Sequence, residues 1–87
     1  MKKLVFAITI LLSQVTVAGP ECTKEPQDKW LNQEAFKKSL TDKGYKIKVF
    51  KVTKGNCYEI YGWNKEGKKI EIYFDPTSGS IVKEETH

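Results

Sequence analysis

One stretch decides how this sequence folds: Lys69-Ile70-Glu71-Ile72-Tyr73-Phe74-Asp75-Pro76-Thr77-Ser78-Gly79. Ile70, Ile72 and Phe74 alternate with more polar residues, and a period of two predicts a β-strand with one buried face. The residues from Asp75 to Gly79 are typical of a turn, which ends the strand. We interpret the rest of the chain as supplying partners for the two faces of this strand.

Residues 1–18 have the composition of a secretory signal peptide. Lys2 and Lys3 form a basic start, an apolar run follows to Leu12, and Ala18 supplies a small residue at the cleavage site. We predict cleavage after Ala18 and a periplasmic or secreted protein. A membrane anchor is the alternative, but the apolar run is far shorter than the roughly 18–20 residues that span a bilayer. We therefore expect no stable membrane anchor after cleavage.

The remaining 69 residues suit one small domain, which we divide into an extended N-terminal arm (19–29), a folded part (30–83) and a polar tail (84–87). Small exported domains often need a covalent link, and the sequence contains two cysteines. We predict a disulfide between Cys22 and Cys57. A redox or metal-binding pair is the alternative, but there is no CxxC motif and the one histidine is His87. We expect no metal site and no cofactor.

The charge of the chain argues against nucleic acid as a partner. All fifteen basic residues are lysines, and losing Lys2 and Lys3 leaves thirteen lysines against eleven acidic residues, a net charge of +2. Arginine is the side chain best suited to phosphates and base edges, and it is missing. The lysines alternate with acidic residues, which is typical of a solvated surface.

The segment before the strands predicts a single helix. Asn32 is a suitable N-cap, Phe36 and Leu40 form an apolar stripe, and Gly44 is suited to ending the helix. A start capped by Asp28 is the alternative.

Short turns then separate strands at residues 45–53, 57–63, 69–74 and 80–83. The alternation slips at Val49-Phe50, which indicates either a β-bulge or a strand with two apolar sides. The predicted fold class is α+β: one α-helix packed on a three- to four-stranded antiparallel β-meander, with the N-terminal arm attached by the disulfide.

The face of the sheet away from the helix combines acidic and aromatic residues. Cross-strand stabilisation is one interpretation of this pattern, and a recognition surface is the other, because exposed Tyr and Trp are frequent interface anchors. The candidate binding face consists of Glu59, Tyr61, Trp63, Glu71 and Tyr73.

No pattern in the sequence indicates a catalytic site. Glu59 and Glu71 lie on neighbouring strands like the acid pair of a hydrolase, but a small meander offers no cleft that would separate their pKa values. Cys57 and His87 could pair as a nucleophile and a base, but Cys57 has a predicted disulfide partner. Two loops resemble fragments of calcium sites, but neither has the required series of oxygen ligands, and both are interpreted as turns.

Five segments occur in a characteristic order and spacing: Trp30, Gly44-Tyr45-Lys46-Ile47, Gly55-Asn56-Cys57-Tyr58-Glu59-Ile60, residues 64–67 and residues 71–82. Taken together, these segments resemble the PepSY domain in its small exported form. The resemblance implies a non-enzymatic module of secreted and envelope proteins, with a helix on an antiparallel sheet and no catalytic residues. PepSY domains also occur in propeptides of secreted metallopeptidases, and the family is proposed to restrain peptidase activity.

Two hypotheses for function follow. The first is an exported protein-interaction module that regulates or inhibits a separate peptidase, with Tyr61, Trp63 and Tyr73 as anchors. The alternative is a small envelope protein that binds a cationic ligand with these aromatics and with Glu59 and Glu71.

Overall fold

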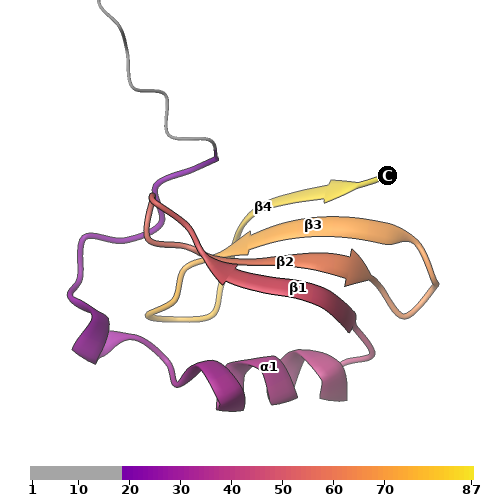
Figure 1. Cartoon of the computed structure of the whole chain (residues 1–87), viewed down its shortest axis with the longest axis horizontal. Helices are drawn as coiled ribbons and strands as arrows, with labels where there is room; N and C mark the ends of the chain where they lie inside the picture. Colours follow the sequence, from indigo (N-terminus) through magenta and orange to yellow (C-terminus); the bar gives the residue numbers. More distant parts are fainter. Residues whose placement is uncertain (1–18) are drawn as a thin grey trace, which may run out of the picture.

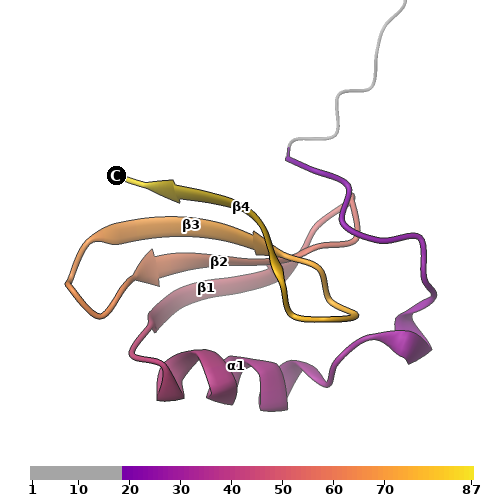
Figure 2. The ribbon, with the colours of Figure 1, turned by 180° about the vertical axis from the view of Figure 1, so that it is seen from behind.

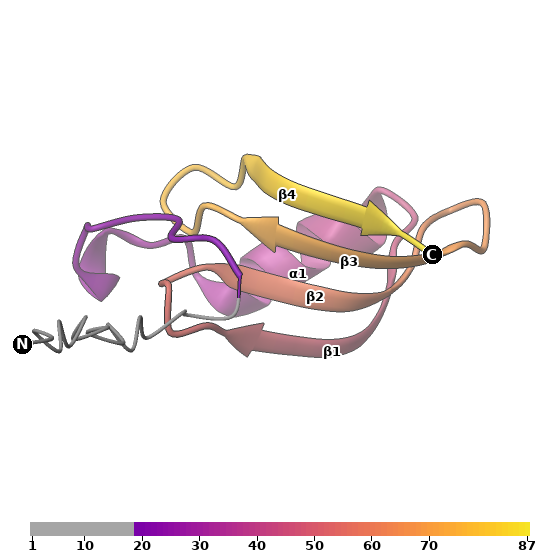
Figure 3. The ribbon, with the colours of Figure 1, turned by 90° about the horizontal axis from the view of Figure 1, so that it is seen from above.

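The computed structural model describes residues 19–87, which form a four-stranded antiparallel sheet with one α-helix on one face (Figure 1). Each strand pairs with its neighbour in sequence, in the order β1-β2-β3-β4, so the sheet is a simple meander (Figure 3). This confirms the predicted fold class. The elements are a 3-10 turn η1 (Gln27–Lys29), α1 (Gln33–Asp42), β1 (Lys46–Val52), β2 (Tyr58–Trp63), β3 (Lys69–Phe74) and β4 (Ile81–Thr86).

The hydrophobic core lies between α1 and the inner face of the sheet (Figure 2). The helix contributes Phe36 and Leu40, both buried. The Phe36 ring meets the Phe74 ring edge-on, with 5.0 Å between centroids, a favourable geometry for two aromatic rings. The remaining members of the core come from the inner face of β2 and β3: Tyr58, Ile60, Ile70 and Ile72.

Both ends of α1 are fixed by local hydrogen bonds. The Asn32 side chain accepts a hydrogen bond from the Ala35 N–H at 3.0 Å, so Asn32 is the N-cap as predicted. At the other end Gly44 has a φ of +99°, and the Tyr45 N–H donates to the Leu40 carbonyl at 3.2 Å. This is the Schellman arrangement that satisfies the last carbonyls of a helix. Asp28, the alternative cap, belongs to the separate turn η1.

A β-bulge lies in β1, slightly earlier than the slip in the sequence suggests. The register shifts between Ile47 and Val49, which leaves Lys48 as the extra residue. Ile47 and Phe50 therefore both pack against the core, while Val49 is 41% exposed. Strand β4 is also longer than expected, because its pairing with β3 continues to Thr86.

The N-terminal arm is attached to the hairpin between β1 and β2. Cys22 and Cys57 form the predicted disulfide, and the Cys22 N–H donates to the Gly55 carbonyl at 2.9 Å. At the start of the arm, Gly19 lies against the Tyr73 ring on the outer face of the sheet. The predicted signal peptide, residues 1–18, lies outside the described residues. Within residues 19–87, neither helix is long and apolar enough to cross a bilayer.

Candidate functional site

Strands β2 and β3 bring the five residues of the predicted binding face onto the side of the sheet opposite α1. Glu59 pairs with Tyr73, and Tyr61 pairs with Glu71, so two acids and two tyrosines occupy alternating corners of one patch. We call these four residues the acid–tyrosine cluster. Trp63, opposite Lys69, continues the same face toward the next turn.

The five residues differ in how far solvent reaches them. Glu59 is 2% exposed and Tyr73 is 8% exposed, so neither presents a surface to a partner. Tyr61 is 37% exposed, and Trp63 and Glu71 are half-buried. The sequence suggests an open face, but only part of that face is open.

The N-terminal arm accounts for this difference at Tyr73. A side-chain carbon placed on Gly19 would lie 2.8 Å from the Tyr73 ring, so the arm passes directly over that ring. The alternation of β2 places Cys57 on the same face as Glu59, two residues away, and Cys57 holds the arm there. The two-residue spacing of Cys57 and Glu59 was the one feature of the sequence that indicated that the arm covers this end of the cluster.

The Glu59 carboxyl is only partly neutralised. The Lys51 Nζ lies 3.5 Å from Glu59 Oε1, while Oε2 is buried and accepts no hydrogen bond from residues 19–87. Buried carboxylate oxygens normally have a partner, because desolvating a charge without one is costly. The neighbouring Glu71 is better satisfied, since its Oε2 accepts a hydrogen bond from the Tyr73 hydroxyl at 3.2 Å.

The two carboxyls of the cluster are separated in acidity. Burial raises the pKa of Glu59 above its ordinary value, and the adjacent Glu71 carboxylate raises it further. Hydrogen bonding from the Tyr61 hydroxyl, and then from the Glu59 carboxyl, holds the pKa of Glu71 below its ordinary value. Glu59 is therefore the first of the two to take up a proton.

This separation makes a pH-dependent contribution to stability. The folded protein holds the Glu59 proton more tightly than the unfolded chain, so this contribution is fully present below the ordinary pKa of 4.5. It is lost as the pH rises through the raised pKa of the folded state. We expect the free energy of unfolding of the wild type, relative to Glu59→Gln, to fall as the pH rises from about 4.5 into the neutral range. Urea unfolding over this pH range, in buffer with EDTA, measures the difference.

Glu66→Gln is the matched control, because Glu66 is an exposed residue of the turn between β2 and β3. Its difference from the wild type should not follow the same curve. A Glu59→Gln difference that stays constant with pH would contradict the assignment.

The geometry does not suit the enzymatic alternatives. Glu59 is 2% exposed, whereas paired-acid hydrolysis needs two carboxyls that both reach an accessible bond. Cys57 is fully buried and bonded to Cys22, so its sulfur is not available as a nucleophile for pairing with His87.

A shallow hollow of about 300 Å³ lies beside the cluster. Aromatic and aliphatic residues line it together with two lysines and a histidine. It is lined by Lys48, Val49, Tyr61, Gly62, Trp63, Lys69, Ile70 and His87.

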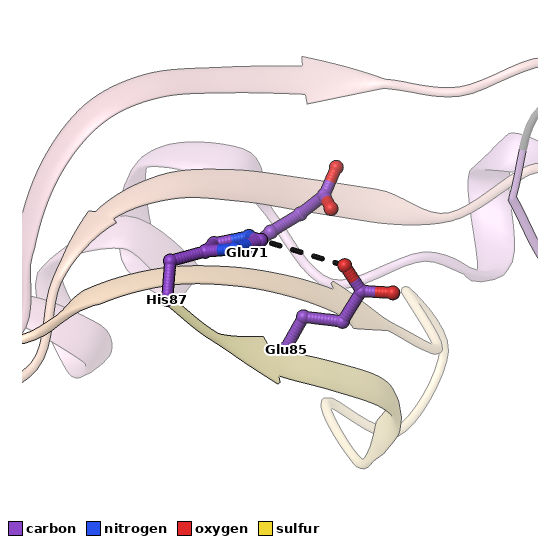
Figure 4. A group of neighbouring side chains, drawn as sticks. All are labelled: Glu71, Glu85 and His87. Carbon is purple, nitrogen blue, oxygen red and sulfur yellow. Dashed lines mark ion pairs between the residues drawn. The ribbon is translucent and has the colours of Figure 1, made fainter.

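Strand β4 adds two residues to this face that were missed in the sequence. Glu85 pairs with Glu71, and His87 follows two positions later (Figure 4). The Lys83 Nζ lies 3.3 Å from Glu85 Oε1, and the His87 Nε2 lies 3.9 Å from Glu85 Oε2. The sequence could have indicated them, because Lys83, Glu85 and His87 are alternate residues and would share one face of a strand. That inference requires the last strand to extend beyond Lys83.

The fold and this face define a class of small α+β module in which a helix covers one side of a meander and the other side stays partly open. A comparison with protein families matches residues 2–85 to the PepSY family described as peptidase propeptide and YPEB domain. The chain belongs to this family, which confirms the resemblance seen in the sequence, and the family's modules are of the non-catalytic propeptide and inhibitor type. Both the family and the disulfide are typical of exported proteins. Searches of curated proteins and of solved structures gave no significant match.

Proposed function

We propose that this protein is an exported, non-enzymatic interaction module that binds a separate peptidase and restrains it. The family supports the general role, because it is described by its place in peptidase propeptides. The observation that carries the proposal here is that Tyr61 is exposed, and Trp63 partly exposed, on the face of the sheet that α1 leaves uncovered.

The exposed part of the face has the composition of a binding surface. Tyr61 and Val49 face outward from neighbouring strands, and Trp63 lines the hollow beside them. Tyr and Trp are the side chains most often found at energetic centres of interfaces, since they bury a large apolar area and keep a polar group. Lys48 and Lys69, which also line the hollow, supply charge for orientation and specificity.

The alternative, a site for a cationic ligand, is less well supported by the arrangement. Glu59 is 2% exposed and already contacts Lys51, and neither Glu59 nor Glu71 lines the hollow. A partly exposed aromatic pair without a reachable acid pair suits a protein partner better than an ammonium group.

Alanine substitutions at Tyr61 and Trp63 test the proposal. Purified residues 19–87 should slow substrate hydrolysis by a peptidase isolated from the exported fraction of the source cell. We expect Tyr61→Ala and Trp63→Ala each to raise the half-inhibitory concentration about tenfold or more, the effect of removing an interface anchor. The melting temperature should change little, because both side chains lie outside the core.

Ile81→Ala is the control, because Ile81 is 49% exposed and lies on the edge strand β4 rather than in the hollow. Its inhibition should equal that of the wild type. Equal loss in all three variants, or no exported peptidase slowed by the wild type, would overturn the proposal.

A further inference from the structure

We propose that Glu71, Glu85 and His87 form a binding site for a divalent transition-metal ion, with Zn²⁺ as the best-fitting species. Each residue offers one donor atom, and these atoms all lie within 4.8 Å of one another. Figure 4 shows the three side chains converging on the outer face of β3 and β4. The site goes beyond peptidase binding and does not depend on it.

The backbone holds the three residues in this arrangement. Glu71 and Glu85 are direct partners across the β3–β4 pairing. The His87 N–H donates to the Lys69 carbonyl at 2.8 Å, which continues the ladder and fixes His87 beside Glu85 on the same face. Only side-chain torsions therefore need to change for the donors to meet an ion.

The donor set suits zinc. Imidazole nitrogen and carboxylate oxygen bind Zn²⁺ at about 2.0–2.2 Å, which places the ligands of a tetrahedral ion roughly 3.3 Å apart. The His87 Nε2 and the Glu85 Oε2 are already 3.9 Å apart. Three protein ligands leave the fourth position for water. A hard ion such as Mg²⁺ would instead require an octahedron of oxygens, which this set does not provide.

Neighbouring hydrogen bonds and ion pairs orient the two carboxylates. The Tyr73 hydroxyl binds Glu71 Oε2, and the Lys83 Nζ contacts Glu85 Oε1. In Glu85 the oxygen that Lys83 does not contact, Oε2, is the one that lies near His87 Nε2. Partners of this kind fix the orientation of metal ligands and are a regular feature of metal sites.

Glu59 provides a second and independent indication that a cation belongs here. Glu59 is the diagonal neighbour of Glu71 across the β2–β3 pairing, is 2% exposed, and has one carboxyl oxygen that accepts no hydrogen bond from residues 19–87. A cation bound at Glu71 would offset the part of this buried negative charge that Lys51, 3.5 Å from Glu59 Oε1, leaves unneutralised. Glu59 itself is too deeply covered to serve as a ligand.

Titration of tag-free, EDTA-treated protein with ZnCl₂ tests the site. We expect calorimetry to show one saturable equivalent, and the NMR signals of the imidazole to shift as the ion binds. Since the sequence has a single histidine, these signals can only be those of His87. His87→Ala and Glu85→Gln should each weaken Zn²⁺ binding at least tenfold.

Glu84→Gln is the matched control, because Glu84 is the neighbour of Glu85 on β4 but pairs with Ile72 on the opposite face. It should bind Zn²⁺ as the wild type does. The His87 and Glu85 side chains are 58% and 44% exposed, so their variants should fold, and melting curves without metal check this. Unsaturable Zn²⁺ binding by the wild type, or unchanged affinity in His87→Ala, would overturn the proposal, as would equal losses in Glu84→Gln and Glu85→Gln.

Discussion

Reducing the disulfide between Cys22 and Cys57 is expected to lower the free energy of unfolding by about 2–4 kcal/mol. The two cysteines are 35 positions apart, and closing a loop of that length restricts the unfolded chain by an amount equivalent to about 4 kcal/mol. A domain of this size has a small core, so this loss is a large part of its total stability.

Urea unfolding of residues 19–87, with and without a reducing agent, measures this effect. Cys22→Ala combined with Cys57→Ala provides a second measurement in oxidising buffer, although the fully buried Cys57 also loses packing. The reducing agent should leave the stability of the double variant unchanged. An equal effect of the reducing agent on both proteins would show that it does not act through this disulfide.

Gly62→Ala is expected to destabilise the domain by about 1–3 kcal/mol, the usual range for overpacking. Gly62 is buried on the inner face of β2, and a side-chain carbon there would run into the backbone carbonyl of Lys46 on β1. The obstacle is backbone, so it can yield only if β1 moves away from β2. This cost should outweigh the gain of about 0.5–1 kcal/mol that alanine normally brings to a strand in place of glycine. Gly62→Val should be worse still.

Gly67→Asn is the control for this prediction. Gly67 has a φ of +80° in the turn between β2 and β3, a conformation that asparagine tolerates, and no atom lies within 4 Å of an added side-chain carbon. Its unfolding midpoint should stay close to that of the wild type. A Gly62→Ala variant as stable as Gly67→Asn would contradict the close approach of β1 and β2.

The features that the sequence predicts well are those with local causes. Asn32 and Gly44 mark the ends of α1 because capping depends on residues within one turn of the helix. The alternation around Ile70 and Ile72 assigns the inner face of β3 for the same reason, since neighbouring residues in a strand point to opposite sides. With short turns between the strands, these signals were sufficient for the fold class and for the residues of the outer face.

The features that the sequence does not predict depend on contacts between distant segments. The burial of Glu59 and Tyr73 on the outer face has no counterpart in the pattern of β2 or β3, and at Tyr73 it follows from the path of the arm. A bulge at any of several residues of β1 would account for the break in its apolar alternation. Only the pairing with β2 places the bulge at Lys48. Glu85 joins the candidate site because β4 continues to pair with β3 beyond Lys83. The residues after Lys83 are polar and mostly exposed, so their pattern does not predict a strand.

The meander topology has a consequence for the order of folding. All three strand pairings join neighbours in sequence, so the sheet can assemble from hairpins whose ends are close along the chain, and such local contacts favour rapid folding. The link between Cys22 and Cys57 has a much longer reach. We therefore expect the hairpins to form first and to fix the position of Cys57. Oxidation of Cys22 and Cys57 would then attach the arm to a sheet that has already folded. Folding of the sheet would in that case be independent of the cellular oxidant, and only the covering of the outer face would wait for it.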